Sequence, residues 1–114
     1  MRYIDLKNIN AISRGNERNV LKYLKQFLEL IPERSEQLKE ALKNEDRLQI
    51  RQILHKMSPQ LQFFGIEDII VPIQRLEFEY QSMPLNELQK LVSEIICKLE
   101  GAINEVSTLI DYKL

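Results

Sequence analysis

Several residue types that mark particular kinds of protein are scarce in this sequence. Its 114 residues include one cysteine, Cys97, so no disulfide can form within the chain. Only 3 glycines and no tryptophan are present, unlike the turn-rich composition of an all-β fold. No apolar run approaches the roughly 18 residues that a membrane-spanning helix needs, and the opening MRYIDLKNIN lacks the apolar core of a signal peptide. We therefore expect a protein of the reducing cytoplasm with no membrane segment.

An excess of charge of either sign is also missing. The chain has 16 basic and 17 acidic side chains, for a formal net charge of -1. No chain-wide positive field favours nucleic acid or an anionic membrane, and we expect neither as a partner. What is plentiful is hydrophobic sequence, at 44% of the residues, enough in a chain of this length for one modest core but not two. We predict a single domain over 1–114.

Apolar residues recur at helical spacing in every segment, without the strict alternation of strands. Gly15 and Gly65 stand where helices are expected to end, and Asn16 stands where one is expected to be capped. Asp46, followed by Gln49, has the spacing of a capping box. The pattern predicts helices over about 6–14, from 16 through 42 with a kink at Pro32, over 46–64, over 66–80, and from 84 through 109.

Short turns separate these helices, and nothing in the sequence resembles a linker between domains. Four substantial helices with such turns pack antiparallel, so we predict an all-α fold, an antiparallel up-and-down four-helix bundle with a short extra N-terminal helix. The last helix repeats its apolar residues at spacings of three and four, which is also typical of a coiled coil that forms dimers. Burial inside the bundle explains that stripe more simply, and we expect a monomer.

The only histidine, His55, lies in the third predicted helix. On a helical wheel one group of apolar residues falls within about 40° of a single direction, which we take as the core: Ile50, Leu54, Met57, Leu61 and Phe64. His55 lies about 140° from that direction by the same geometry, so its imidazole is expected to face solvent. The outward face also carries residues suited to docking a protein partner: Leu48, Gln52, Pro59, Phe63 and Ile66.

The neighbours of His55 limit the chemistry that it can perform. Within one helical turn on either side lie Arg51, Gln52, Ser58 and Pro59, and none of them is a carboxylate. The chain shows no hydrolytic triad, no set of metal ligands and no glycine loop that would cradle a nucleotide phosphate. We therefore expect no bound metal or other cofactor and no autonomous kinase or hydrolase activity. The chemistry that remains possible for His55 is nucleophilic attack by the neutral imidazole on a group that another protein presents.

The segment LHKMSPQLQFFG resembles the active-site helix of histidine-containing phosphotransfer (HPt) domains. The resemblance rests on His55, on Gly65 at the end of the same predicted helix, and on Leu76 and Glu77 in the following helix. The segment FLELIPERSEQLKEALKNED resembles the preceding helix of the family. The likeness covers almost the whole chain. Two positions depart from it, because Ser58 stands where the family usually has lysine and Pro59 where it usually has glycine.

The resemblance implies that His55 accepts a phosphoryl group from the aspartate of a receiver domain, in a response regulator or a hybrid sensor kinase, and passes it to another receiver. Magnesium would belong to the receiver. Arg51, Ser58 and Gln62 are expected to support the phosphoryl group, with Lys56 as another source of charge. The altered Ser58 and Pro59 leave an alternative open, a non-catalytic HPt-like adaptor that binds a receiver or kinase without carrying phosphate.

Pro59 raises a separate question about the helix itself. Proline has no amide hydrogen and crowds the carbonyl four residues earlier, which here belongs to His55. We predict a bend that presents the imidazole outward. A straight helix that tolerates the proline is one alternative. The other is a break at Ser58 and Pro59, which would act as the cap and first residue of a new helix.

Overall fold

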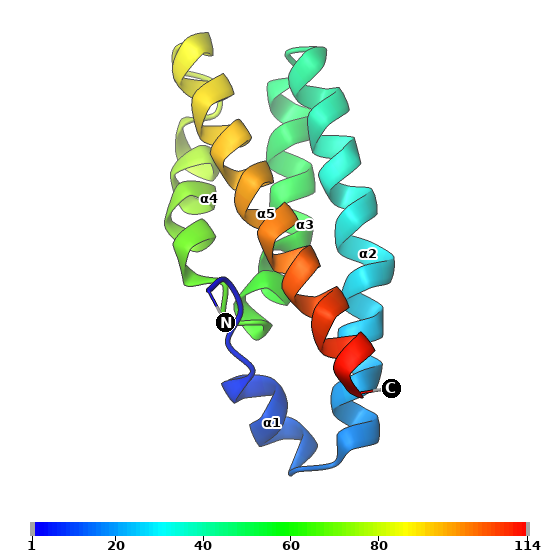
Figure 1. The fold of residues 1–114 in the computed structure, drawn as a ribbon. Helices are drawn as coiled ribbons and strands as arrows, with labels where there is room; N and C mark the ends of the chain where they lie inside the picture. Colours follow the sequence, from blue (N-terminus) through cyan, green and yellow to red (C-terminus); the bar gives the residue numbers. More distant parts are fainter. Residues whose placement is uncertain (1, 114) are drawn as a thin grey trace.

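The computed structural model describes residues 2–113, and these form five α-helices without a strand. The helices are α1 (Lys7–Ser13), α2 (Glu17–Lys43), α3 (Arg47–Phe63), α4 (Glu67–Glu79) and α5 (Leu85–Lys113). Figure 1 shows α2 to α5 side by side along one axis, with α1 at one end. The pairs α2 and α3, α3 and α4, α4 and α5, and α2 and α5 pack together. The predicted up-and-down four-helix bundle with a short N-terminal helix is confirmed.

The helix boundaries follow from the local chemistry of the sequence. The Asn16 side chain caps α2 by accepting hydrogen bonds from the amides of Arg18 and Asn19. Asp46 caps α3 by accepting from the amide of Gln49 at 3.1 Å. The predicted capping box is only half formed, because the Asp46 amide donates to the carbonyl of Ala41 instead of to the glutamine. The sequence signals therefore locate both helix starts.

Three of the four prolines, Pro32, Pro59 and Pro72, lie inside helices that continue past them. Helix α2 runs through Pro32 without a break, as predicted. Helix α3 runs from Arg47 to Phe63 with Pro59 inside it, so the alternative of two helices separated at Ser58 is wrong. Because Pro59 has no amide hydrogen, the carbonyl of His55 receives no hydrogen bond from that position of the helix. The outward bend at His55 stays a prediction.

The core contains the apolar stripe of every long helix. All five residues predicted to point inward from α3 are buried, and Ile53 joins them. The α5 stripe is buried as well, through Leu88, Val92, Ile95, Leu99, Ala102 and Val106. Full burial of one such valine, leucine or isoleucine side chain is worth about 1.5–3 kcal/mol. The repeat in α5 thus serves the bundle core. No helix among residues 2–113 is both long and apolar enough to cross a membrane.

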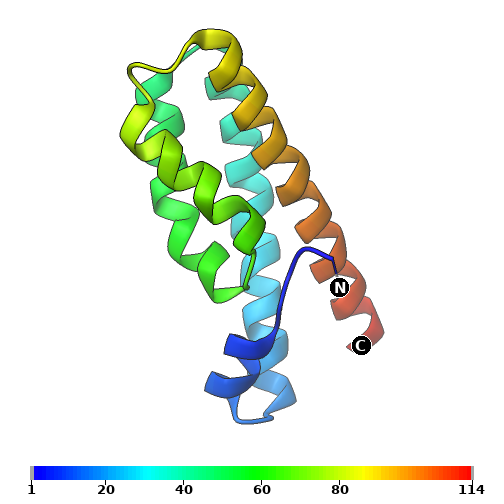
Figure 2. The ribbon, with the colours of Figure 1, turned by 90° about the vertical axis from the view of Figure 1, so that its left-hand side faces the viewer.

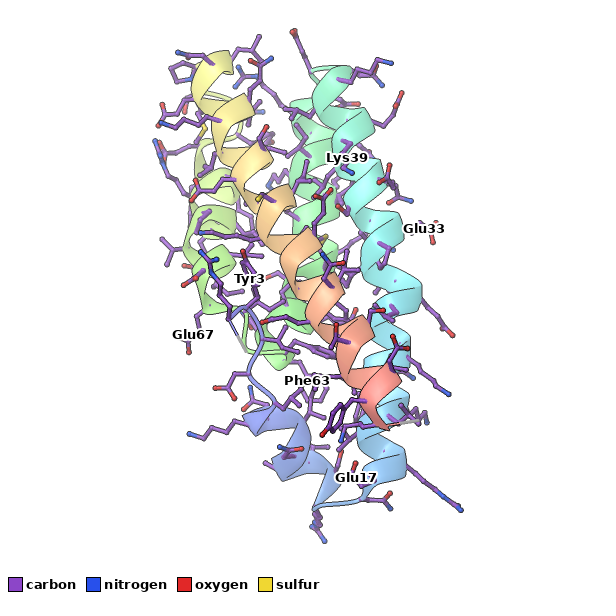
Figure 3. All side chains as sticks on the ribbon, viewed as in Figure 1. Tyr3, Glu17, Glu33, Lys39, Phe63 and Glu67 are labelled. Atoms are coloured by element: carbon purple, nitrogen blue, oxygen red, sulfur yellow. The ribbon has the colours of Figure 1, made fainter. Side chains whose placement is uncertain are left out.

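The segment that precedes α1 is bound along the side of the bundle. In Figure 2 it runs from α1 to the neighbourhood of α5. The Glu105 carboxylate of α5 accepts hydrogen bonds from the amides of Tyr3, at 2.8 Å, and Ile4, at 3.2 Å. The Asp5 amide donates to the carbonyl of Phe64 at 2.9 Å. Tyr3 lies beside α5 in Figure 3. Through these hydrogen bonds the segment from Arg2 to Leu6 contacts both the end of α3 and α5. We call it the N-terminal strap.

Candidate functional site

Helix α3 presents His55 to solvent. Ile53, Leu54 and Met57 are buried, and they fix the rotation of the helix about its axis. The His55 side chain is left 69% exposed, which confirms the outward orientation predicted from the helical wheel. A partner can therefore reach the ring without any rearrangement of the core.

Glu77 of α4 binds the imidazole from the neighbouring helix. Its Oε1 lies 3.0 Å from Nδ1 of His55, and its side chain is only 25% exposed. Helix α4 buries Ile69, Ile73 and Leu76, and the residue after Leu76 is rotated about 100° from that stripe, toward α3. The packing of α4 thus positions the carboxylate against the histidine.

The chemistry of this hydrogen bond selects one form of the neutral ring. An ionised carboxylate only accepts hydrogen bonds, so Nδ1 of His55 is the donor in the contact with Glu77. The proton of the neutral ring is then on Nδ1, and the lone pair is on Nε2. Because most of the ring is exposed, Nε2 is a nucleophile available at the surface of the bundle.

Arg51 is held against the end of α4. Its Nε donates to the carbonyl of Glu77 at 3.4 Å, and its guanidinium lies over the ring of Tyr80 at 5.3 Å from the centroid. Arg47 donates from Nη1 to the Tyr80 carbonyl at 2.9 Å. Both arginines therefore tie the end of α4 to α3. Arg51 is therefore hydrogen-bonded to the backbone of Glu77, the residue whose side chain contacts His55.

The other predicted supporting residues, Ser58 and Gln62, lie on α3 about one and two helical turns after His55. Ser58 is half-buried and Gln62 is exposed. The Gln62 carbonyl accepts a long hydrogen bond of 3.5 Å from the side chain of Asn8. Within residues 2–113 no group of three or more histidine, cysteine, aspartate or glutamate side chains is placed to hold a metal ion.

Most of the predicted docking residues are accessible. Leu48 is 51% exposed, and Gln52 and Pro59 are exposed as well. Phe63 is half-buried, because its ring packs edge-on against Tyr23 with centroids 5.2 Å apart. Figure 3 shows Phe63 toward the α1 end of the bundle. The surface around His55 therefore combines polar residues with a few apolar ones.

Ile66 is not part of that surface, and its prediction as a docking residue is wrong. It is fully buried. Gly65 adopts a left-handed conformation with φ 68°, which reverses the chain at the end of α3. The amide of Ile66 then donates to the carbonyl of Leu61 at 3.1 Å, and the side chain folds into the core. The helical wheel of α3 does not apply beyond Phe64.

Sequence reasoning located the exposed histidine but not the carboxylate that contacts it. In the sequence, Glu77 was noted only because Leu76 and Glu77 resemble the family, and no role was assigned to it. A usable signal was present, since a carboxylate next to the buried stripe of the following helix faces the neighbour across an antiparallel pair. The contact between the helices was needed to assign its partner.

Comparison with known proteins supports the fold. The HPt domain of an Hpt sensor hybrid histidine kinase from Shewanella is similar to this chain with a TM-score of 0.80. The match covers 96% of this chain and 94% of that domain, at 18% sequence identity. No protein-family model and no curated protein matches the sequence. The protein is an HPt-like helical bundle, and the resemblance seen in the sequence is confirmed at the level of the fold.

Proposed function

We propose that this protein is a phosphorelay intermediate of two-component signal transduction. His55 accepts a phosphoryl group from the aspartate of one receiver domain and passes it to the aspartate of another. The observation that carries the proposal is the contact of 3.0 Å between Glu77 and Nδ1 on an otherwise exposed ring. It leaves the second ring nitrogen as a nucleophile in the middle of an accessible helix.

The chemical step follows from that geometry. The lone pair of Nε2 attacks the phosphorus of the aspartyl phosphate in line, a bond between nitrogen and phosphorus forms, and the bond to the aspartate oxygen breaks. The aspartate leaves as a carboxylate. The ring keeps its proton on Nδ1 and becomes cationic, opposite the carboxylate of Glu77. The reverse step returns the phosphoryl group to a second receiver.

Glu77 contributes to both directions of transfer. It holds the ring in the productive tautomer before the attack and stabilises the positive charge that develops on the ring during it. Magnesium and the acidic groups that bind it belong to the receiver, so this chain supplies the nucleophile and its orientation. Receivers of response regulators or hybrid sensor kinases are the partners, and we place the relay in the cytoplasm.

The test is transfer of label from a receiver. The protein and the variant His55→Gln are each incubated with a magnesium-loaded receiver domain that carries labelled aspartyl phosphate. Because His55 is the only histidine, acid-labile label is expected on the unmodified chain and not on the variant. Binding of receivers without any transfer, across a panel of them, would overturn the proposal in favour of the adaptor to which Ser58 and Pro59 point.

A further inference from the structure

Helix α4 carries an apolar surface that the bundle does not cover. Phe78 is 88% exposed and Val71 is 69% exposed. The two residues are seven positions apart, which places them within about 20° of one another around the helix axis. Helix α2, the other neighbour of α3, has no large hydrophobic side chain that is exposed in this way. Of the two helices that pack against α3, only α4 therefore carries large hydrophobic side chains exposed to this degree.

Phe78 lies close to the proposed phosphorylation site. It directly follows Glu77, whose carboxylate is 3.0 Å from Nδ1 of His55. A glutamate side chain spans about 5 Å from Cα to its oxygens, and consecutive Cα atoms are about 3.8 Å apart. The Cα of Phe78 is therefore within roughly 12 Å of the imidazole. Leu48 is seven residues before His55, which places it about 10 Å from His55 along the axis of α3, at about 1.5 Å per residue.

A protein partner that reaches Nε2 of His55 forms an interface wide enough to contact residues at these distances. A stable protein interface buries about 800 Å² on each side, which corresponds to a disc of radius about 16 Å. Centred on His55, that disc includes Phe78 as well as Leu48. Gln74 and Gln81, about one helical turn on either side of Phe78, are exposed and carry no charge, while the exposed Arg75, three residues before it, is paired with Glu79 and Glu87. Aromatic residues and arginine are both enriched at the centre of protein interfaces, so an exposed Phe78 beside Arg75 has a composition typical of one.

From these observations we infer that the receiver domain docks across α3 and α4, with Phe78 as its main apolar contact. The inference rests on the proposed function and adds to it the surface that determines receiver affinity. It also assigns α4 a second role. Glu77 orients the nucleophile from the face of α4 toward α3, while Phe78, one residue later, contacts the partner from the outer face.

The test compares two exposed aromatic residues. Tyr112 is 91% exposed near the end of α5, and the adjacent Lys113 forms an ion pair of 2.7 Å with Glu17 at the start of α2, away from α4. Phe78→Ala and Tyr112→Ala are assayed for label transfer over a range of receiver concentrations. We expect Phe78→Ala to raise the concentration for half-maximal transfer about tenfold, the size of effect typical of an interface anchor. Tyr112→Ala should leave it within about twofold.

The outcomes separate this inference from the proposed function. The maximal rate in Phe78→Ala should stay near that of the unmodified chain, since His55 and Glu77 are intact. An unchanged half-maximal concentration, with the unmodified chain labelled, would overturn the docking surface alone. Absence of label on the unmodified chain with every receiver would overturn both. Dimers of the unmodified chain that Phe78→Ala dissociates, with transfer unaffected, would show that a second copy covers the face instead.

Discussion

Removal of the Glu77 carboxylate should slow transfer without weakening receiver binding. In Glu77→Ala the imidazole loses the acceptor 3.0 Å from Nδ1. The ring is then free to place its proton on Nε2, where it blocks the attack, and the positive charge that develops during transfer is no longer compensated. In Glu77→Gln the amide oxygen still accepts a hydrogen bond but brings no charge, so we expect an intermediate rate.

The size of the effect follows from the exposure of the pair. A hydrogen bond to a charged group contributes about 1.5–3 kcal/mol. The His55 side chain is 69% exposed, so water competes for Nδ1 and the lower end of that range applies. About 1.4 kcal/mol corresponds to a tenfold change. We therefore expect Glu77→Ala to lower the maximal rate of transfer about tenfold.

The assay is transfer of label from a receiver at increasing concentration, with Glu79→Gln as the matched control. Glu79 is on the same helix, but its carboxylate binds Arg75 at 3.0 Å instead of the histidine. A loss confined to the maximal rate in the Glu77 variants, with unchanged half-saturation, is the expected result. Full activity of Glu77→Ala, or an equal loss in Glu79→Gln, would refute the assigned role.

Two further predictions concern stability. Gly65→Ala should destabilise the protein more than Gly15→Ala in urea unfolding. Both glycines have positive φ, at 68° and 78°, but only at Gly65 would the added Cβ meet the strap, 2.7 Å from the Cβ of Asp5. The left-handed conformation alone costs about 1–2 kcal/mol, so equal losses would show that the strap does not constrain Gly65. Ser35→Ala should raise the midpoint of thermal unfolding, because the Ser35 hydroxyl is buried without a hydrogen-bond partner, at a cost of about 1–3 kcal/mol. A lower midpoint would mean that the hydroxyl is stabilising.

The features that the sequence predicts well depend on contacts within one helix. The caps at Asn16 and Asp46 and the outward face of His55 follow from the spacing of residues along the chain, and the structure has them all. Helical periodicity also separates the buried stripe from the exposed face, so the four long helices and their antiparallel packing can be predicted. Local chemistry is sufficient for each of these.

The features that it does not predict depend on contacts between elements. Glu77 reaches His55 only because α4 packs beside α3, and Arg51 is fixed by atoms of α4 as well as by its own helix. Ile66 turns inward because a left-handed glycine reverses the chain just before it. The hydrogen bonds that the Glu105 carboxylate accepts from the N-terminal strap likewise connect residues from opposite ends of the sequence. Each of these contacts forms only when one element packs against another, so the spacing of residues along the chain does not specify its partner.

The position of the phosphoryl group on the imidazole tests the account most directly. Nuclear magnetic resonance of the nitrogen-15-labelled protein, phosphorylated by a receiver, shows which ring nitrogen is coupled to phosphorus. Coupling to Nε2 of His55, with the proton retained on Nδ1 toward Glu77, is the result that the structure predicts. Phosphorus on Nδ1, or no phosphohistidine signal with receivers that bind the protein, would contradict it.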